Sequence, residues 1–489
     1  MITVLRARRA AVPILGLVFS MSFAAAAAAV PALPRFESGA LAEAVLATAP
    51  GGGLLLDNVE VAGTGEAAAL VLERFEVFTS DAVIIVHGDE GETRLPAPRN
   101  AYFKGAVDGE PGSRVLLSVL EDGTVQGIVT RPEGLYLIGG EEDGAAQKML
   151  GGPLSMHEVD PISLKTASSG FACGNDQLHP VTDPLAALGV PEPAALNAAV
   201  EKVEKAASYA ARIAIETDYE FYLKFNNVTN ATNYAVNLLA YASTVYESEI
   251  NTALMVPSVS LWTTSSDPWS QNGTLCGLME FGRYWNKNNT GISRTLAHFF
   301  SGRALGGGIA WLGVLCSGGF GANANCPGLA TDASWGGGYG FTASLSGLFS
   351  INNPTVMWDI VAVSHEIGHN FNSPHTHCYN GIGGESQAVD GCYNGECANG
   401  CFCGTQGLPG LQGARSGTLM SYCHLLSGGF TNIAMTFGTN HPYGVQPGRV
   451  SSRMSSHVVS RATSNPSCLA YSPGIFTDSF ESGTSTSWH

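Results

Sequence analysis

The sequence predicts an α/β (α+β) domain preceded by a β-rich domain, and two patterns indicate this division. Across residues 70–140, short apolar runs alternate with polar residues and are separated by Gly, Pro and Asp, which is typical of antiparallel β structure. From residue 212 onward, strand-like and helix-like stretches follow one another, as in a sheet with crossover helices. With 45% hydrophobic residues, the chain has enough apolar side chains to bury a core.

The spacing of apolar residues also predicts the individual strands and helices of the second half of the chain. Apolar runs with β-branched and aromatic residues predict strands, and apolar positions at helical spacing predict helices. We expect strands at 212–221 and 254–262, helices at 233–250, near 275–285 and near 293–300, a strand at 309–315 after three glycines, and a strong helix at 356–371.

The N-terminal residues predict secretion. Residues 1–29 join a basic start to an apolar, alanine-rich stretch with an A-x-A pattern at Ala27 and Ala29, which is typical of a signal peptide. An uncleaved membrane anchor is the alternative. No later stretch is long and apolar enough to cross a membrane, so we expect a secreted, extracellular protein without membrane contact after signal removal.

Charge and composition bound the partners and the domain limits. The 41 acidic and 24 basic residues give a net charge of −17, so we expect no nucleic-acid partner. Prolines at 180–193 and a charged, alanine-rich segment predict a linker, and the Ser/Thr/Gly-rich end predicts a flexible tail. The resulting divisions are 1–29, 30–185 (β-rich), 186–205 (linker), 206–469 and 470–489 (tail).

One motif carries the chemistry. His365 and His369 are four residues apart on the predicted helix, so both imidazoles can reach one ion. Pro374 stops the helix, and the chain can turn to bring in His375 as a third ligand. Three protein ligands with a fourth position for water are typical of catalytic Zn²⁺. Glu366 can then act as general base toward the metal-activated water.

The stretch from His365 to His375 resembles the metzincin zinc endopeptidases, whose pattern is H-E-x-x-H-x-x-G-x-x-H followed by a methionine turn. Residues 212–468 look like the reprolysin/adamalysin branch. The resemblance implies a mixed twisted sheet, an active-site helix and a smaller disulfide-rich lower subdomain. It also implies one catalytic Zn²⁺, with Met420 of the methionine turn beneath the histidines. Bound Ca²⁺ is compatible with the sequence but is not indicated by it, and we expect a monomer.

Two positions depart from the family pattern. Asn372 replaces the glycine, and Asn is the residue after Gly that best adopts positive φ. Thr376 replaces the aspartate that the reprolysin branch carries after the third histidine. This difference leaves the assignment to that branch undecided, but it does not affect the expected zinc chemistry.

Further residues are assigned by resemblance. Tyr422 stands where other metzincin branches place a tyrosine near zinc or the developing oxyanion; core packing is the alternative. Strand 309–315 would be an exposed edge that pairs with extended peptide or protein substrates. His298, His377 and His424 are expected to be structural.

The chain has 11 cysteines, an odd number. In an oxidising compartment, ten of them between residues 276 and 468 can form five disulfides; a structural zinc site in the cluster 378–423 is the alternative. The resemblance implies a Cys316–Cys468 pair. Cys173 is left over, and it resembles the cysteine switch of metzincin propeptides, in which a thiolate occupies the fourth zinc position. A thiol without mechanistic role is the alternative.

The sequence therefore predicts a secreted zinc metalloendopeptidase made as a zymogen, with residues 30–185 as a propeptide that inhibits the enzyme intramolecularly. A catalytically silent binding or adhesion module on the same fold is one alternative, and a zinc hydrolase for non-peptide substrates is another. The first would be expected to have lost Glu366 or a ligand, and this sequence keeps all four residues.

Overall fold

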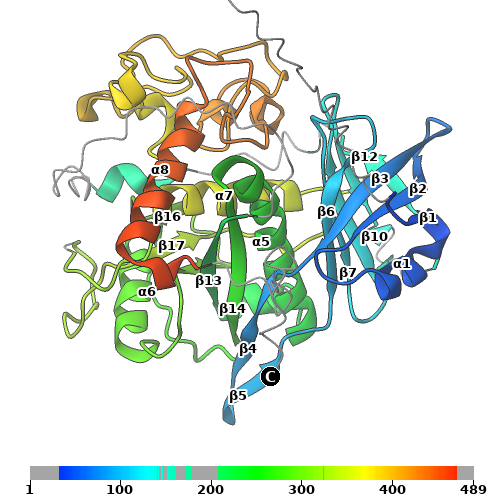
Figure 1. Cartoon of the computed structure of the whole chain (residues 1–489). Coiled ribbons are helices and arrows are strands. Elements are labelled where there is room, and N and C mark those ends of the chain that lie inside the picture. Colours follow the sequence, from blue (N-terminus) through cyan, green and yellow to red (C-terminus); the bar gives the residue numbers. More distant parts are fainter. Residues whose placement is uncertain are drawn as a thin grey trace, which may run out of the picture. The chain divides into compact units, whose positions relative to one another are not determined.

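The computed structural model shown in Figure 1 describes residues 32–139, 141–142, 145–146, 151–160, 163, 172–178, 207–322 and 324–470. The predicted signal peptide (1–29), linker (186–205) and C-terminal tail (470–489) lie outside these residues, apart from residue 470. Contacts divide the chain into Met1–Leu33 and Pro34–His489, and the description below concerns the second unit. None of the helices in the described ranges is both long and apolar enough to cross a membrane.

The first sheet is antiparallel for most of its length and nearly closed. Its strand order is β1-β2-β12-β9-β8-β7-β6-β3, and a further pairing of β2 with β3 joins the two sides into a barrel. Inward residues such as Val115 and Leu117 fill one core, whereas Leu116 between them packs into the core of the second sheet. The strands are β1 (Arg35–Glu37), β2 (Gly53–Val61), β3 (Glu66–Phe75), β6 (Ala101–Val107), β7 (Arg114–Val119), β8 (Val125–Thr130), β9 (Leu135–Ile138) and β12 (Ser155–Glu158), with α1 (Leu41–Ala47) beside them and a small pair of β10 (Glu141–Glu142) and β11 (Ala145–Ala146).

The second sheet is mixed, with strand order β16-β17-β15-β13-β14-β4-β5. Strands β17, β15, β13, β14 and β4 run parallel, and β16 and β5 are antiparallel to their neighbours at the two edges. The strands are β13 (Tyr209–Thr217), β14 (Thr252–Trp262), β15 (Leu296–Phe300), β16 (Gly308–Ala310), β17 (Tyr339–Thr342), β4 (Phe78–Gly88) and β5 (Gly91–Pro96).

Strands β4 and β5 come from the first half of the chain but extend the sheet of the second half. Val83 to His87 of β4 pair in parallel with Ser258 to Trp262 of β14. The imidazole of His87 stacks on Trp262 with ring centroids 4.1 Å apart, and the Arg212 guanidinium pairs with the Asp81 carboxylate at 2.7 Å. Sequence periodicity placed these strands in the antiparallel region and gave no sign of this partner.

The helices α5 (Val228–Ile250) and α7 (Val356–Asn370) form the core of the second half, together with α4 (Tyr219–Leu223), α6 (Thr274–Asn288) and α8 (Arg449–Ser464). The side chain of Asn227 caps α5 by accepting from the Asn230 amide, and Asn251 ends the helix at φ 58°. Helix α5 is buried on nearly all sides because it contacts β14, α7 and the barrel strand β7. Helix α5 lies beside β14 (Figure 1), and α7 contacts β16 and β17.

Three sequence-based elements differ from the structure. The strand predicted at 212–221 is β13, which ends at Thr217, and α4 begins at Tyr219. The helix predicted near 293–300 is the strand β15. Its residues are buried on both faces, so they form a continuous apolar run that periodicity cannot assign to strand or helix. The strand predicted at 309–315 is only Gly308–Ala310, because the chain turns at Gly313, whose φ is 66° and whose amide donates to the carbonyl of His369.

Five disulfides join the ten cysteines of the second half, as predicted, and Cys316 pairs with Cys468 as the resemblance implied. Among the described residues, Cys173 is the one cysteine outside a disulfide, and it is buried. The other pairs are Cys276–Cys326, Cys378–Cys401, Cys392–Cys423 and Cys397–Cys403.

Candidate metal centre

Helix α7 carries two of the predicted ligands on one face. All residues of α7 are buried, so the helix packs in the core and holds its histidines rigidly. The helix ends after Asn370, and Asn372 adopts φ 77°, the left-handed conformation expected at the position of the family glycine. The Arg453 side chain contacts both the carbonyl and the side-chain oxygen of Asn372. The chain then turns back, and His375 faces the helix.

Four side chains converge at this turn. The ligand atoms of His365, His369, His375 and Cys173 all lie within 4.8 Å of one another, and all four residues are buried. The Nε2 atoms of His365 and His369 are 3.1 Å apart, and Sγ of Cys173 lies 3.4 Å from Nε2 of His369. Residues far apart in sequence therefore form one cluster of three imidazoles and a thiol.

The far side of each imidazole is held by a hydrogen bond from Nδ1, which leaves Nε2 for the cluster. Metal-binding histidines are commonly oriented by such a bond. The acceptors are the carbonyl of Leu419 for His365 (2.7 Å), the carbonyl of Ser373 for His369 (2.7 Å) and Oε1 of Glu396 for His375 (2.8 Å).

The donor set fits Zn²⁺. Among the described residues, Nε2 of His375 and Oε1 of Glu366 are buried without a hydrogen-bond partner, an arrangement that is costly unless another group satisfies them. Imidazole nitrogens and thiolate sulfur are common zinc ligands, and the three histidines together with Cys173 supply the four ligands of a tetrahedral site.

Burial sets the protonation of these groups. Desolvation holds the pKa of His365 and His369 well below the usual value and lowers the pKa of His375 to about 4. The three imidazoles are therefore neutral near pH 7 and able to bind a cation. Burial, and then the nearby Glu366 carboxylate, raise the pKa of the Cys173 thiol; burial also raises the pKa of Glu366. A bound divalent cation acts against both of the latter shifts.

Glu366 lies between the cluster and the sheet edge. Its side chain is fully buried, and Oε2 is 3.6 Å from Sγ of Cys173. A Cβ added at Gly308 of β16 would overlap the Glu366 carboxyl group, and one at Gly307 would overlap the carbonyl of Ala172. Glycine at 307 and 308 therefore allows the close approach of these groups to the backbone.

The methionine turn lies against the helix. Met420 is fully buried, and a Cβ at Gly368 of α7 would overlap its sulfur. The Thr376 amide donates to the carbonyl of Met420 at 3.0 Å. The phenol of Tyr422 donates to the carbonyl of Cys173 at 2.9 Å, so this side chain reaches the cluster.

The Cys173 segment covers the sheet edge that was expected to be exposed. The amide of Ala172 donates to the carbonyl of Gly306 at 2.9 Å, and a 3-10 turn, η2 (Gly174–Leu178), contacts β16. Strand β16 is buried in this state.

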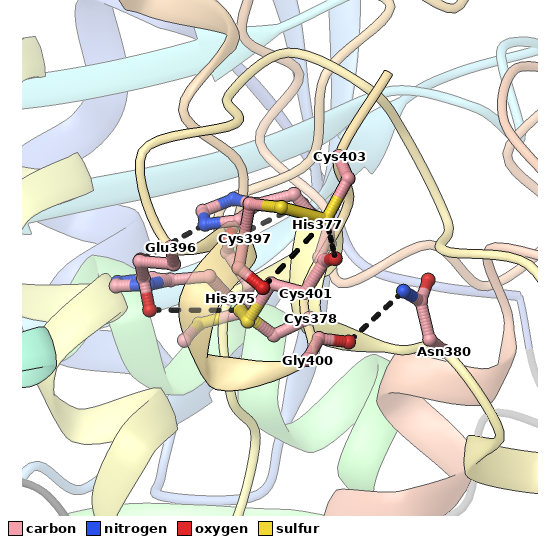
Figure 2. Close-up of a disulfide and its surroundings, with 11 residues drawn as sticks. His375, His377, Cys378, Asn380, Glu396, Cys397, Gly400, Cys401 and Cys403 are labelled. Carbon is pink, nitrogen blue, oxygen red and sulfur yellow. Dashed lines mark hydrogen bonds and ion pairs between the residues drawn. A yellow bond between two sulfur atoms is a disulfide. The ribbon is translucent and has the colours of Figure 1, made fainter.

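The remaining histidines differ in their surroundings. His298 on β15 shares a hydrogen bond with the Thr342 hydroxyl at 2.8 Å, and His424 packs on the ring of Trp358; neither belongs to a cluster of metal-ligating groups among the described residues. His377 lies next to the cluster, because its Nε2 and Nδ1 of His375 both hydrogen-bond to Oε1 of Glu396 (Figure 2). Sequence reasoning missed Glu396, since nothing in its position within the cysteine-rich segment indicated this contact.

Comparisons with known proteins bear on the same region. Residues 207–431 match the reprolysin-type model of metallo-peptidase family M12. The crystal structure of metalloproteinase-II from Bacteroides fragilis is similar at 10% sequence identity and a TM-score of 0.33, over 73% of this chain and 93% of that one. No curated protein matches. On the sequence model alone, residues 207–431 form a reprolysin-like metzincin region that matches the M12 metallopeptidases, a family that uses zinc.

Proposed function

We propose that the protein is a secreted zinc endopeptidase made as a zymogen, with His365, His369 and His375 as the zinc ligands. The observation that carries the proposal is the convergence of these three neutral imidazoles with Cys173 in one buried cluster, next to the carboxyl group of Glu366.

Glu366 is the general base in this proposal. Zinc, when bound, acidifies a water molecule and polarises the carbonyl of the scissile peptide bond. The Glu366 carboxylate takes the proton from the attacking water and passes it to the nitrogen of the leaving amine. Its Oε1 atom has no partner among the described residues, so one oxygen is available for this transfer.

Tyr422 and Met420 support the reaction in different ways. The Tyr422 phenol now donates to the carbonyl of Cys173. When that segment has left, the same phenol can donate to the carbonyl oxygen of a substrate as negative charge develops there. Met420 packs against α7 and thereby holds this helix in a fixed position relative to the methionine turn.

Cys173 is the latency switch in this proposal. Its segment occupies the edge of β16, where an extended substrate would add as a strand. Cleavage within 186–205 would cut the covalent link between residues 30–185, the propeptide, and residues 206–469, the protease domain, and would allow the Cys173 segment to leave the cluster. The reading as a silent binding module is not favoured, because Glu366 and all three histidines are present.

The test is cleavage of an unfolded protein by the processed enzyme, with and without a zinc chelator. Glu366→Gln should lower kcat about 100- to 10,000-fold, the usual contribution of a general base, while zinc content stays at one ion per chain. Glu220→Gln, which changes an exposed carboxylate on α4, is the matched control and should behave as wild type. Chelator-insensitive cleavage, or full activity of Glu366→Gln, would contradict the proposal.

A further inference from the structure

A buried carboxylate, Glu396, connects the third histidine to a cysteine-rich loop (Figure 2). Glu396 is 6% exposed. Its Oε1 accepts a hydrogen bond from Nδ1 of His375 at 2.8 Å and another from Nε2 of His377 at 2.9 Å. Such a buried carboxylate needs partners of this kind to offset its loss of hydration.

Two disulfides hold the chain on both sides of this carboxylate. The Cys378–Cys401 bond ties the turn that follows His375 to the loop, and the Cys397–Cys403 bond closes the loop next to Glu396. Figure 2 shows both bonds around the pair of histidines.

Backbone hydrogen bonds complete the loop. The amide of Phe402 donates to the carbonyl of His377 at 2.8 Å, and the amide of Asn399 donates to the carbonyl of Glu396 at 2.9 Å. Beyond the 3-10 turn Cys397–Asn399, the loop residues 391–404 have no helix. We infer that its shape depends on the disulfides, which are its covalent ties.

Among the residues that the structure describes, the second carboxylate oxygen of Glu396 has no proton donor. Oε2 of Glu396 lies 3.6 Å from Sγ of Cys378, but a disulfide sulfur carries no proton, so this is a packing contact. The two imidazoles therefore fix the carboxylate through Oε1 alone. The ring of His377 also stacks on that of His375, with centroids 5.1 Å apart and planes 19° apart.

This arrangement distinguishes His375 from the other two predicted ligands. His365 and His369 donate to backbone carbonyls, whereas His375 donates to a carboxylate. A carboxylate partner fixes the ring and the tautomer, and it increases the donor strength of the opposite nitrogen. That nitrogen, Nε2 of His375, points into the cluster.

We propose, on the basis of the zinc centre proposed above, that Glu396 is the positioning residue of His375, and that the Cys378–Cys401 and Cys397–Cys403 disulfides hold it in place. Glu396 does not touch substrate. Its effect is on zinc retention: removal lets the His375 ring turn and weakens one of the three protein ligands of the active enzyme.

The experiment compares the unprocessed full-length chain with Glu396→Ala and Glu396→Gln. Zinc release to a coloured chelator gives the affinity, and the visible spectrum of the Co²⁺-substituted protein reports the ligand geometry. Glu396→Ala should lower zinc affinity about 10- to 100-fold, the usual effect of losing such a partner. Glu396→Gln, which keeps one acceptor oxygen, should lie between Glu396→Ala and wild type, and the Co²⁺ spectrum should shift in both variants.

Controls separate positioning from folding. Glu385→Gln changes a partly exposed glutamate whose carboxylate accepts from Gln446, and it should bind zinc as wild type does. The double variant Cys397→Ser/Cys403→Ser should lose affinity in the same direction as Glu396→Ala. If either of these variants fails to fold, Glu396→Gln still decides the question. After processing, activity of Glu396→Gln should recover with added zinc at an unchanged KM for peptide.

Three outcomes would overturn the inference. One is wild-type zinc affinity in Glu396→Ala with an unshifted Co²⁺ spectrum. Another is a loss of zinc-free stability in Glu396→Gln without a change in affinity, which would make Glu396 purely structural. The third is a second equivalent of zinc that depends on Glu396, which would make it a ligand. Each leaves the proposed protease intact if wild type still needs zinc; a wild-type chain that binds no zinc would instead refute the proposed function.

Discussion

Replacing Cys173 by alanine should make the uncleaved chain active. The thiol contacts His369 at 3.4 Å and Glu366 at 3.6 Å in a fully buried position. Four-ligand zinc sites contribute about 10–16 kcal/mol, so one ligand is worth roughly 3 to 4 kcal/mol. About 1.4 kcal/mol corresponds to a tenfold change in an equilibrium constant. The population of molecules in which the Cys173 segment has left the histidine cluster should therefore rise about 100- to 1000-fold.

The variant should still be less active than the processed enzyme. The hydrogen bonds from Ala172 to Gly306 and from Tyr422 to the Cys173 carbonyl remain, and each contributes about 1 kcal/mol. The assay is initial-rate cleavage of a fluorogenic unfolded protein, with gel analysis showing that the chain is intact. Leu178→Ala, which alters the same segment away from the cluster, is the control and should stay latent. A Cys173→Ala protein that folds, binds zinc and is as inactive as wild type would refute the switch.

Three further predictions concern the protein around the centre. Met420→Ala should lower the free energy of unfolding by about 2–5 kcal/mol and Met420→Leu by less than about 1.5 kcal/mol, measured by denaturant titration, because the side chain is fully buried against α7; equal losses would contradict this packing. Burial lowers the pKa of His298 to about 3, so its contribution to the free energy of unfolding is present above pH 6.5 and is lost as the pH falls toward 3. Relative to His298→Gln, the wild-type free energy of unfolding should fall by about 4 kcal/mol between pH 7 and pH 3. Parallel pH profiles of the two proteins would contradict this. After cleavage of the linker, the segment carrying β4 and β5 should remain bound through the β4–β14 pairing and co-elute in size-exclusion chromatography; immediate separation would show that this pairing is weak.

The sequence could predict the three histidines and Glu366 because their spacing is local. Residues one helical turn apart share a face, and a proline with an asparagine after the helix specifies the return of the chain. The Asn372 backbone shows that the family glycine is replaceable here, since it takes the same left-handed conformation. Thr376, which replaces the family aspartate, uses its hydroxyl on the carbonyl of Met420.

The features that sequence reasoning missed depend on contacts between distant segments. The pairing of β4 with β14 joins strands more than 160 residues apart, and neither strand differs in composition from an ordinary barrel strand. Glu396 follows His375 by 21 residues, in a loop that the Cys378–Cys401 and Cys397–Cys403 disulfides tie to the turn after His375. Strand β15 was predicted as a helix because burial on both faces removes the alternation that marks a strand.

The most direct test of the account is X-ray absorption at the zinc edge of the intact, unprocessed chain. We predict one zinc per chain with three nitrogen ligands at about 2.0–2.1 Å and one sulfur ligand at about 2.3 Å. The sulfur signal should be replaced by oxygen after processing and in Cys173→Ala. A chain without zinc, or a zinc site without sulfur in the unprocessed wild type, would contradict the account.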